Sequence, residues 1–284
     1  MKKLLLIFLI ILFFSCSERK QNGLPKLIDS KVKNSIQVNS KEMLNIESFM
    51  PLAFNFDEDL KVKTLRHRFD SVRSKKIPFD SVIPKYNLKI VIDTSYFISN
   101  NWYVYNFVPR PKNVIQEGRL NGKIPTKIDQ QKSFAILTEY LDKRTELQEA
   151  NVNCYPLLVY NLSENEAYMN SEFIQEAKDI DGKWKPIEFT FLYEMCGTGK
   201  GFQSALEPKK YVAFSIIKYK GDFKTKIRVK FRNNRHIYYS NEIEGTINRS
   251  QFNQDFKKSY FESYGSNISS SDFDFYSKDI FLNE

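Results

Sequence analysis

The chain has 284 residues, of which 43 are basic and 34 are acidic, and its formal net charge is +9. Apolar residues make up 42% of it and aromatic residues 15%, which excludes general disorder because such a chain can build a sizeable core. With only two histidines, His67 and His236, neither a zinc cluster nor a Ser-His-Asp arrangement is expected. The length suggests one or two domains.

The first sixteen residues have the layout of a secretory leader. Lys2 and Lys3 precede an apolar run from Leu4 to Phe14, and Ser15-Cys16 follows. A basic start, a short apolar segment and a small residue at the cleavage site are typical of such leaders. The alternative is a membrane-spanning helix, but such a helix needs about 20 apolar residues and this run is too short for one.

Because Cys16 follows the small residue directly, this segment resembles the precursor of a bacterial lipoprotein. Phe13 departs from the pattern, since leucine usually stands at that position. The resemblance implies that residues 1–15 are a signal peptide and that Cys16 is acylated, so that membrane lipid would hold the chain. Ser17 is not acidic, which in such lipoproteins favours the outer membrane. An exported protein rarely meets nucleic acid, so we expect none as a partner.

The next part of the chain divides into a polar segment and a mixed region. Residues 16–40 are rich in Ser, Asn, Lys and Gln, which indicates a lipidated tether. Residues 41–150 form an expected α+β region. Helical spacing of apolar residues predicts helices over 57–76 and 131–149. Alternation predicts a hairpin over 87–109 that turns near Ser99-Asn100-Asn101.

The region 151–250 contains short alternating segments that are typical of strands. Asp181-Gly182 predicts a hairpin turn between 173–178 and 184–195. In its second arm we expect Ile187 and Phe189 on the apolar face and Glu188 on the other. Further strands are predicted over 156–162, 211–219, 223–232 and 237–247.

About seven short strands in fewer than 100 residues predict an antiparallel β-sandwich, so the chain is expected to be mainly β. Segment 153–250 resembles bacterial immunoglobulin-like domains in architecture and strand spacing, although no diagnostic motif supports the likeness. Cys154, Trp184 and Cys196 occur in the order of the antibody pattern, but Cys196 arrives too early to be the second core cysteine. Residues 251–284 are expected to be a C-terminal extension.

Five cations alternate with apolar residues along the strand predicted over 223–232. They are Lys224, Lys226, Arg228, Lys230 and Arg232. One interpretation is a solvated strand face that also protects against edge pairing. The other is a face that binds an anionic ligand, such as an acidic glycan or a lipid headgroup.

Two cysteines, Cys154 and Cys196, remain after lipidation of Cys16, and an exported chain permits them to form a disulfide. Their sequence separation does not decide whether they pair. Gly197 to Gly201 form a glycine-rich loop that lacks the P-loop spacing, and Asp179-Ile180-Asp181-Gly182 lacks the spacing of a calcium loop. Both are expected to be turns, so we expect no cofactor, no metal and no catalytic residue.

These observations lead to one functional expectation and two alternatives. The expectation is a lipid-anchored protein of the cell envelope that is not an enzyme and acts as a binding or assembly module, with an envelope protein or an anionic glycan as its partner. The first alternative is a surface glycan-binding lipoprotein. The second is an envelope hydrolase. Trp102 and Trp184 are expected in the core more than as sugar platforms.

Overall fold

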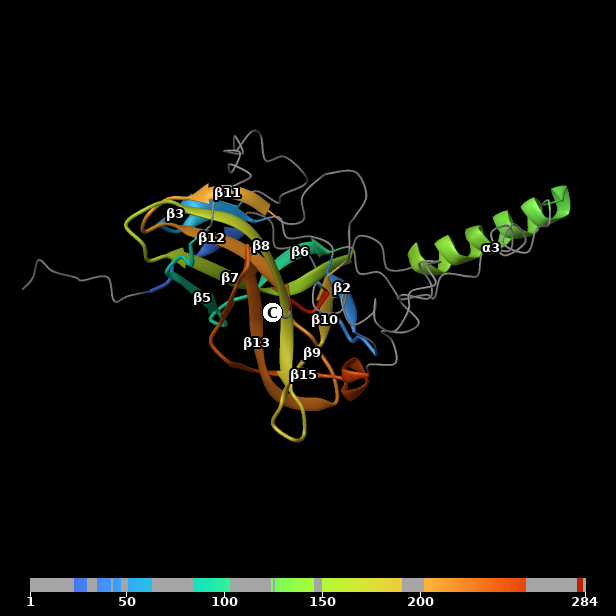
Figure 1. Cartoon of the computed structure of the whole chain (residues 1–284). Coiled ribbons are helices and arrows are strands. Elements are labelled where there is room, and N and C mark those ends of the chain that lie inside the picture. The colour runs from blue at the N-terminus through green and yellow to red at the C-terminus, as the bar shows by residue number, and fades with distance from the viewer. Residues whose placement is uncertain are drawn as a thin grey trace, which may run out of the picture.

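The computed structural model describes residues 23–29, 35–41, 43–46, 51–62, 84–102, 124, 126–145, 150–190, 202–253 and 280–282. Within these ranges the chain is mainly β, as expected, and two antiparallel sheets form its body (Figure 1). The leader, Cys16, His67 and Cys196 lie outside the described residues. The glycine-rich loop over 197–201 lies outside them too.

The first sheet is organised by two long neighbouring strands, β8 (Ala167–Lys178) and β13 (Phe223–Asn233). Each long strand also pairs with two short strands, one toward each of its ends. On β8 these are β11 (Phe202–Leu206) and β9 (Trp184–Pro186), and on β13 they are β14 (His236–Tyr239) and β15 (Ile243–Ile247). As a result β13 lies inside the sheet and is not an edge strand.

The second sheet combines strands from both halves of the chain. Its order is β3 (Ala53–Phe56), β12 (Tyr211–Ile217), β7 (Ala150–Asn161) and β5 (Leu88–Ile92), and β6 (Ile98–Trp102) also pairs with β7. The central strand β12 is almost wholly buried, in agreement with its apolar sequence on both faces.

The core between the sheets is centred on three phenylalanine rings. Phe173 of β8 and Phe231 of β13 belong to the first sheet, and Phe214 of β12 belongs to the second. The ring centroids of Phe173 and Phe214 are 5.3 Å apart, and those of Phe214 and Phe231 are 6.1 Å apart. All three side chains are buried. This contact joins the two sheets face to face, which is the packing of a β-sandwich.

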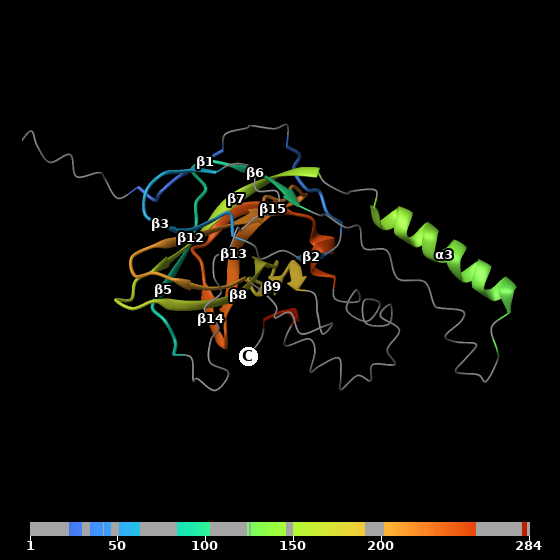
Figure 2. The ribbon, with the colours of Figure 1, turned by 90° about the horizontal axis from the view of Figure 1, so that it is seen from above.

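The remaining described elements lie around or away from this core. Two small parallel pairs are formed by β1 (Leu27–Asp29) with β4 (Leu60–Val62) and by β2 (Leu44–Ile46) with β10 (Glu188–Thr190). A short 3₁₀ helix covers Arg249–Phe252. The helix α3 (Lys127–Thr145), which confirms the prediction over 131–149 up to residue 145, extends away from the sheets (Figures 1 and 2).

The sandwich does not coincide with the predicted segment 151–250. Strands β3, β5 and β6 precede that segment and complete the second sheet, so no separate sandwich is confined to it. The predicted boundary also falls within β7, which begins at Ala150. Among the described residues between Ala150 and Ile247 there are nine strands, not about seven. Short edge strands that share one long partner explain the larger number.

The hairpin predicted over 87–109 is wrong in its pairing and in its turn. Strands β5 and β6 both pair with β7 and not with each other, and β6 runs through the predicted turn at 99–101. The chain turns earlier, where Asp93 Oδ1 accepts a hydrogen bond of 2.9 Å from Ser95 N. The Asp-Thr-Ser sequence is typical of a turn, but it lies inside the segment that the alternating pattern predicted to be one continuous strand. Residues 103–109 lie outside the described part of the chain.

Two further predicted elements differ from the structure. The helix over 57–76 is wrong at its beginning, because Leu60–Val62 is strand β4, and residues 63–76 are not described. The arm over 237–247 is two strands, β14 and β15. At Ser240 the backbone N–H still donates to Val229 O, but the side-chain Oγ accepts the hydrogen bond from Val229 N, and the regular ladder ends there. A bend in an edge segment leaves no mark in a period-two pattern.

The hairpin turn at Asp181-Gly182 is confirmed. Asp179 Oδ1 accepts hydrogen bonds of 2.9 Å from the backbone N–H groups of Asp181 and Lys183. Gly182 has φ of 73°, a conformation that favours glycine. The hydrogen-bonded ammonium of Lys185 holds the pKa of Asp179 below its usual value. This aspartate therefore closes a turn instead of forming part of a calcium loop.

Candidate functional site

The five predicted cations share one face of β13, and we call this surface the charged face. It is the face of the first sheet opposite the core, since the alternate residues Ile227, Val229 and Phe231 belong to the core. Exposure differs along the strand: Lys224 and Lys226 are exposed, Arg228 and Arg232 are half-buried, and only 6% of Lys230 is exposed. The face is therefore not a uniform solvated stripe.

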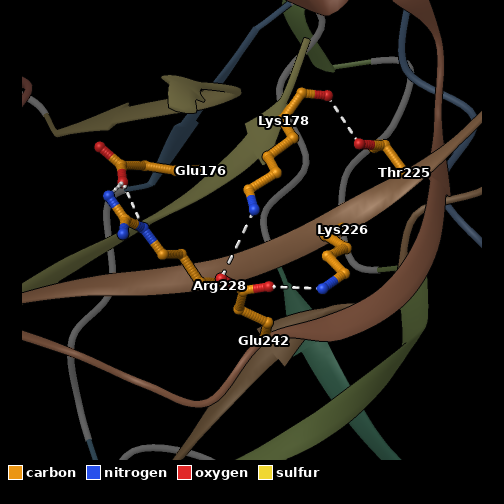
Figure 3. A network of polar contacts seen from close by, with 6 residues as sticks. All are labelled: Glu176, Lys178, Thr225, Lys226, Arg228 and Glu242. Carbon is orange, nitrogen blue, oxygen red and sulfur yellow. Dashed lines mark hydrogen bonds and ion pairs between the residues drawn. The ribbon is translucent and has the colours of Figure 1, made fainter. Parts of the chain in front are cut away.

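Arg228 forms the most complete ion pair of the charged face. Its Nε and Nη2 donate hydrogen bonds of 2.9 and 2.7 Å to Glu176 Oε2, and Glu176 lies directly across from it on β8 (Figure 3). Only 6% of Glu176 is exposed. A carboxylate buried to this extent needs a charged, hydrogen-bonded partner. Lys230 Nζ lies 3.9 Å from the other oxygen, Glu176 Oε1.

Arg232 repeats this arrangement four residues further along the strand. Its Nε donates a hydrogen bond of 2.9 Å to Glu172 Oε2, and its Nη2 contacts the same oxygen. Glu172, which is also buried, lies directly across from Arg232 on β8. The two buried carboxylates therefore neutralise the half-buried cations of the central part of the charged face.

The exposed end of the charged face has a looser network. Glu242 accepts a hydrogen bond of 2.9 Å from Lys226 Nζ, and Lys178 Nζ lies 3.7 Å from its other oxygen (Figure 3). The hydrogen bond from Lys226 is the main cause that holds the pKa of Glu242 below its usual value. Thr225 Oγ1 donates to Lys178 O at 2.6 Å. Lys224 has no carboxylate partner among the described residues.

Two aromatic rings enclose the guanidinium of Arg228. Its Cζ lies 4.2 Å from the ring centroid of Trp184 and 3.9 Å from that of Tyr239. Lys178 Nζ also lies over Trp184, at 5.0 Å. Trp184 is half-buried and 47% of Tyr239 is exposed, so Trp184 stands at the charged face and not in the core. Cation–π contacts of this kind add to the ion pair and fix the guanidinium plane.

A second polar cluster lies inside the protein around Glu188 of β10. Glu188 Oε1 accepts hydrogen bonds from Tyr219 Oη at 2.6 Å and from Gln175 Nε2 at 2.7 Å, and Glu188 Oε2 accepts one from Gln175 N at 2.7 Å. Only 2% of Glu188 is exposed. Loss of solvation raises its pKa to about 7, against the opposing effect of these hydrogen bonds.

The prediction that Glu188 lies on a polar strand face is therefore wrong. All three residues of β10 are buried, so this strand has no solvent-facing side. The other two residues of β10 are buried as well. Phe189 is buried as predicted, and Thr190 Oγ1 donates a hydrogen bond of 3.4 Å to Ile280 O. Alternation identifies two faces of a strand but not whether another element covers both of them.

The cysteine predictions are only partly within the described structure. Cys154 is buried in β7, and its Sγ lies 3.5 Å from Val152 O. Cys16 and Cys196 lie outside the described residues, so lipidation and the Cys154–Cys196 bridge stay predictions. His236 is half-buried at the start of β14, and the side chain of Trp102 is not described.

Within the described ranges, no group of three or more His, Cys, Asp or Glu residues is placed to hold a metal ion. No helix in this part of the chain is long and apolar enough to cross a membrane.

We compared the chain with protein-family models, with curated proteins and with solved structures, and none of them matches it.

Proposed function

We propose that this protein is a lipid-anchored component of the bacterial cell envelope, held in the outer membrane through Cys16, and that it acts as a non-catalytic binding or assembly module. The observation that carries the anchor is the sequence from Lys2 to Cys16. Two or three acyl chains would give stable attachment, whereas one gives only marginal binding. The tether predicted over 16–40 is wrong from Leu27 onward, because Leu27–Asp29 is strand β1 and Val38 is buried in the core. The folded body would then follow the anchor within a few residues.

The anchor predicts that Cys16→Ala releases the protein from membranes. The variant has no thiol for acylation and no longer matches the processing site, so we expect loss of palmitate labelling and a shift from the membrane fraction to the soluble fraction. Ser17→Ala is the matched control, since it changes the adjacent residue and keeps the thiol. Unchanged membrane association of Cys16→Ala, with Ser17→Ala behaving as the wild type, would contradict the anchor.

The charged face supports the assembly role. Its central cations have buried carboxylate partners, which argues against a free cationic surface for an anionic glycan. What it offers instead is a mixed-charge surface with Trp184, Arg228 and Tyr239 stacked together. Trp, Tyr and Arg are the residue types most enriched at the centres of protein interfaces. We therefore place the contact with an envelope protein on this face.

A photo-crosslinking residue at position 239 tests this placement in intact cells. Tyr239 is exposed beside Arg228, and we expect a crosslinker there to yield one discrete adduct with an envelope protein. The control position is Ile180, which is 76% exposed in the hairpin turn and lies outside the aromatic stack. Equal adducts from both positions, or none from position 239, would count against the charged face as the contact surface.

A further inference from the structure

A pocket of about 230 Å³ opens between the two sheets at the end where β15 lies. Residues of β7, β8, β12, β13 and β15 line it, together with Gln37 of the segment 35–41. Ligand pockets for drug-sized molecules are usually about 300–1,000 Å³. This pocket therefore suits a single small ring.

The Glu188 cluster fixes one wall of this pocket. Gln175 lines the pocket, and its Nε2 donates to Glu188 Oε1 at 2.7 Å and to Ile217 O at 3.0 Å. Both N–H bonds of the amide are thereby used, which leaves Gln175 Oε1 as an acceptor with no donor among the described residues. Since Gln175 is 1% exposed, this acceptor is held rigidly by a buried network before any ligand arrives.

The aromatic ring of Phe97 contacts two other residues that line the pocket, Tyr155 and Lys218. The ring of Phe97 is 5.3 Å from that of Tyr155, and Lys218 Nζ lies 3.8 Å from the Phe97 centroid. Tyr155 and Lys218 line the pocket, and 52% of Phe97 is exposed. Phe97 does not line the pocket itself, but its exposed ring extends the aromatic surface of Tyr155 beside the ammonium of Lys218. Such a surface offers an apolar contact to a ligand that has both apolar and polar sides.

The charges around the pocket are few and of both signs. Lys218 and Lys224 line it together with Glu244, which leaves one positive charge, and the ammonium of Lys218 is placed over the ring of Phe97. The polar lining also includes the amides of Gln37 and Gln175, while Ile217, Ile227 and Ile243 supply apolar surface. The lining thus combines donors, acceptors and apolar surface, with a single excess positive charge instead of a cluster of cations.

We propose that this pocket binds one neutral sugar ring of an envelope glycan, with a hydroxyl group donating to Gln175 Oε1 and an apolar ring face resting on Phe97 and Tyr155. A sugar ring has the required combination, because its C–H groups form an apolar face and its hydroxyl groups both donate and accept. The choice of an envelope glycan rests on the proposed envelope location. The pocket shares Lys224 with the charged face but does not include Arg228, Trp184 or Tyr239, so one module could hold a glycan and a protein partner together.

Saturation-transfer NMR on the full chain in detergent micelles tests the pocket. The probes are free galactose, mannose and N-acetylglucosamine as neutral sugars, glucuronic acid as a charged sugar and adenosine as a non-sugar ring. We expect transfer to at least one neutral sugar, and affinity roughly tenfold lower in Phe97→Ala, the scale of one aromatic contact. Gln37→Ala should also weaken binding, and neither change removes a buried side chain.

The matched control is Phe134→Ala, which removes a 71% exposed ring from α3 and should bind as the wild type does. The proposal is overturned if no neutral sugar binds, if only glucuronic acid or adenosine binds, or if Phe97→Ala and Phe134→Ala bind equally. Membrane fractionation of the same variants tests the lipid anchor independently of sugar binding. Failure of sugar binding with retained membrane association removes the ligand and leaves the envelope location standing.

Discussion

Replacement of Arg228 by methionine is expected to cost about 3–5 kcal/mol of unfolding free energy, because it removes both hydrogen bonds that the buried carboxylate of Glu176 accepts at Oε2. Lys230 Nζ, 3.9 Å from Glu176 Oε1, is too distant to take over both hydrogen bonds. Methionine still fills part of the space between Trp184 and Tyr239, so the loss of stability is due mainly to the missing charge and not to a cavity. Urea unfolding at neutral pH measures it.

Two variants make this result specific to the buried pair. In the double variant Arg228→Met with Glu176→Leu, the buried carboxylate is removed together with Arg228, and part of the lost stability should return, although Lys230 loses its contact with Glu176 Oε1. Lys226→Met breaks the exposed pair with Glu242, in which 49% and 40% of the two side chains are exposed, and should cost several times less. Equal losses in Arg228→Met and Lys226→Met would show that the Glu176 pair is not the stabilising contact.

The sequence predicts the cations of the charged face but not the residues that neutralise them. Alternation along 223–232 places all five cations on one side of a strand, and the structure confirms this. Their partners Glu172 and Glu176 lie on β8, more than 50 residues earlier, and become partners only through the register of β8 against β13. Register depends on the whole sheet, so neither pairing nor burial can be derived from the pattern of β13 alone.

The second sheet shows a similar limit at the level of topology. Its strands are mostly recognisable one by one, since Leu88–Ile92 and Tyr211–Ile217 have clear apolar patterns. Their order is non-local, because β7 pairs with β5, β6 and β12, which are contributed from both sides of it in the chain. A sequence pattern identifies a strand and the next turn. It does not identify which of several distant strands completes a sheet.

The free energy of unfolding should fall by about 3 kcal/mol as the pH rises from about 4.5 to 7, through Glu188 alone. Burial raises the pKa of Glu188 from 4.5 to about 7 in the folded state. In that pH window the folded chain therefore binds more protons than the unfolded chain, and each rise in pH favours unfolding. The contribution is fully present below the unfolded pKa and is lost as the pH passes the folded pKa.

The hydrogen bonds around Glu188 indicate where its proton lies. Oε2 faces the N–H of Gln175, which can only donate, so a proton on Oε2 would oppose it. Oε1 faces the hydroxyl of Tyr219, which can rotate and accept. Burial and the neighbouring Glu188 raise the pKa of Tyr219 well above 10, so this hydroxyl stays neutral across the window. The proton therefore belongs on Oε1, between Glu188 and Tyr219.

Glu188→Gln should remove this pH dependence, because an amide does not titrate. We expect urea unfolding at pH 5 and pH 8 to give the same stability for Glu188→Gln, whereas the wild type should be less stable at pH 8. Glu58→Gln changes an exposed glutamate and should keep the wild-type difference. The carboxylates whose pKa is lowered, Glu242 and Asp179, lose their stabilising contacts only at more acidic pH, and their effect has the opposite sign. A wild-type slope retained in Glu188→Gln would therefore assign the pH dependence to another group and leave Glu188 ionised within the core.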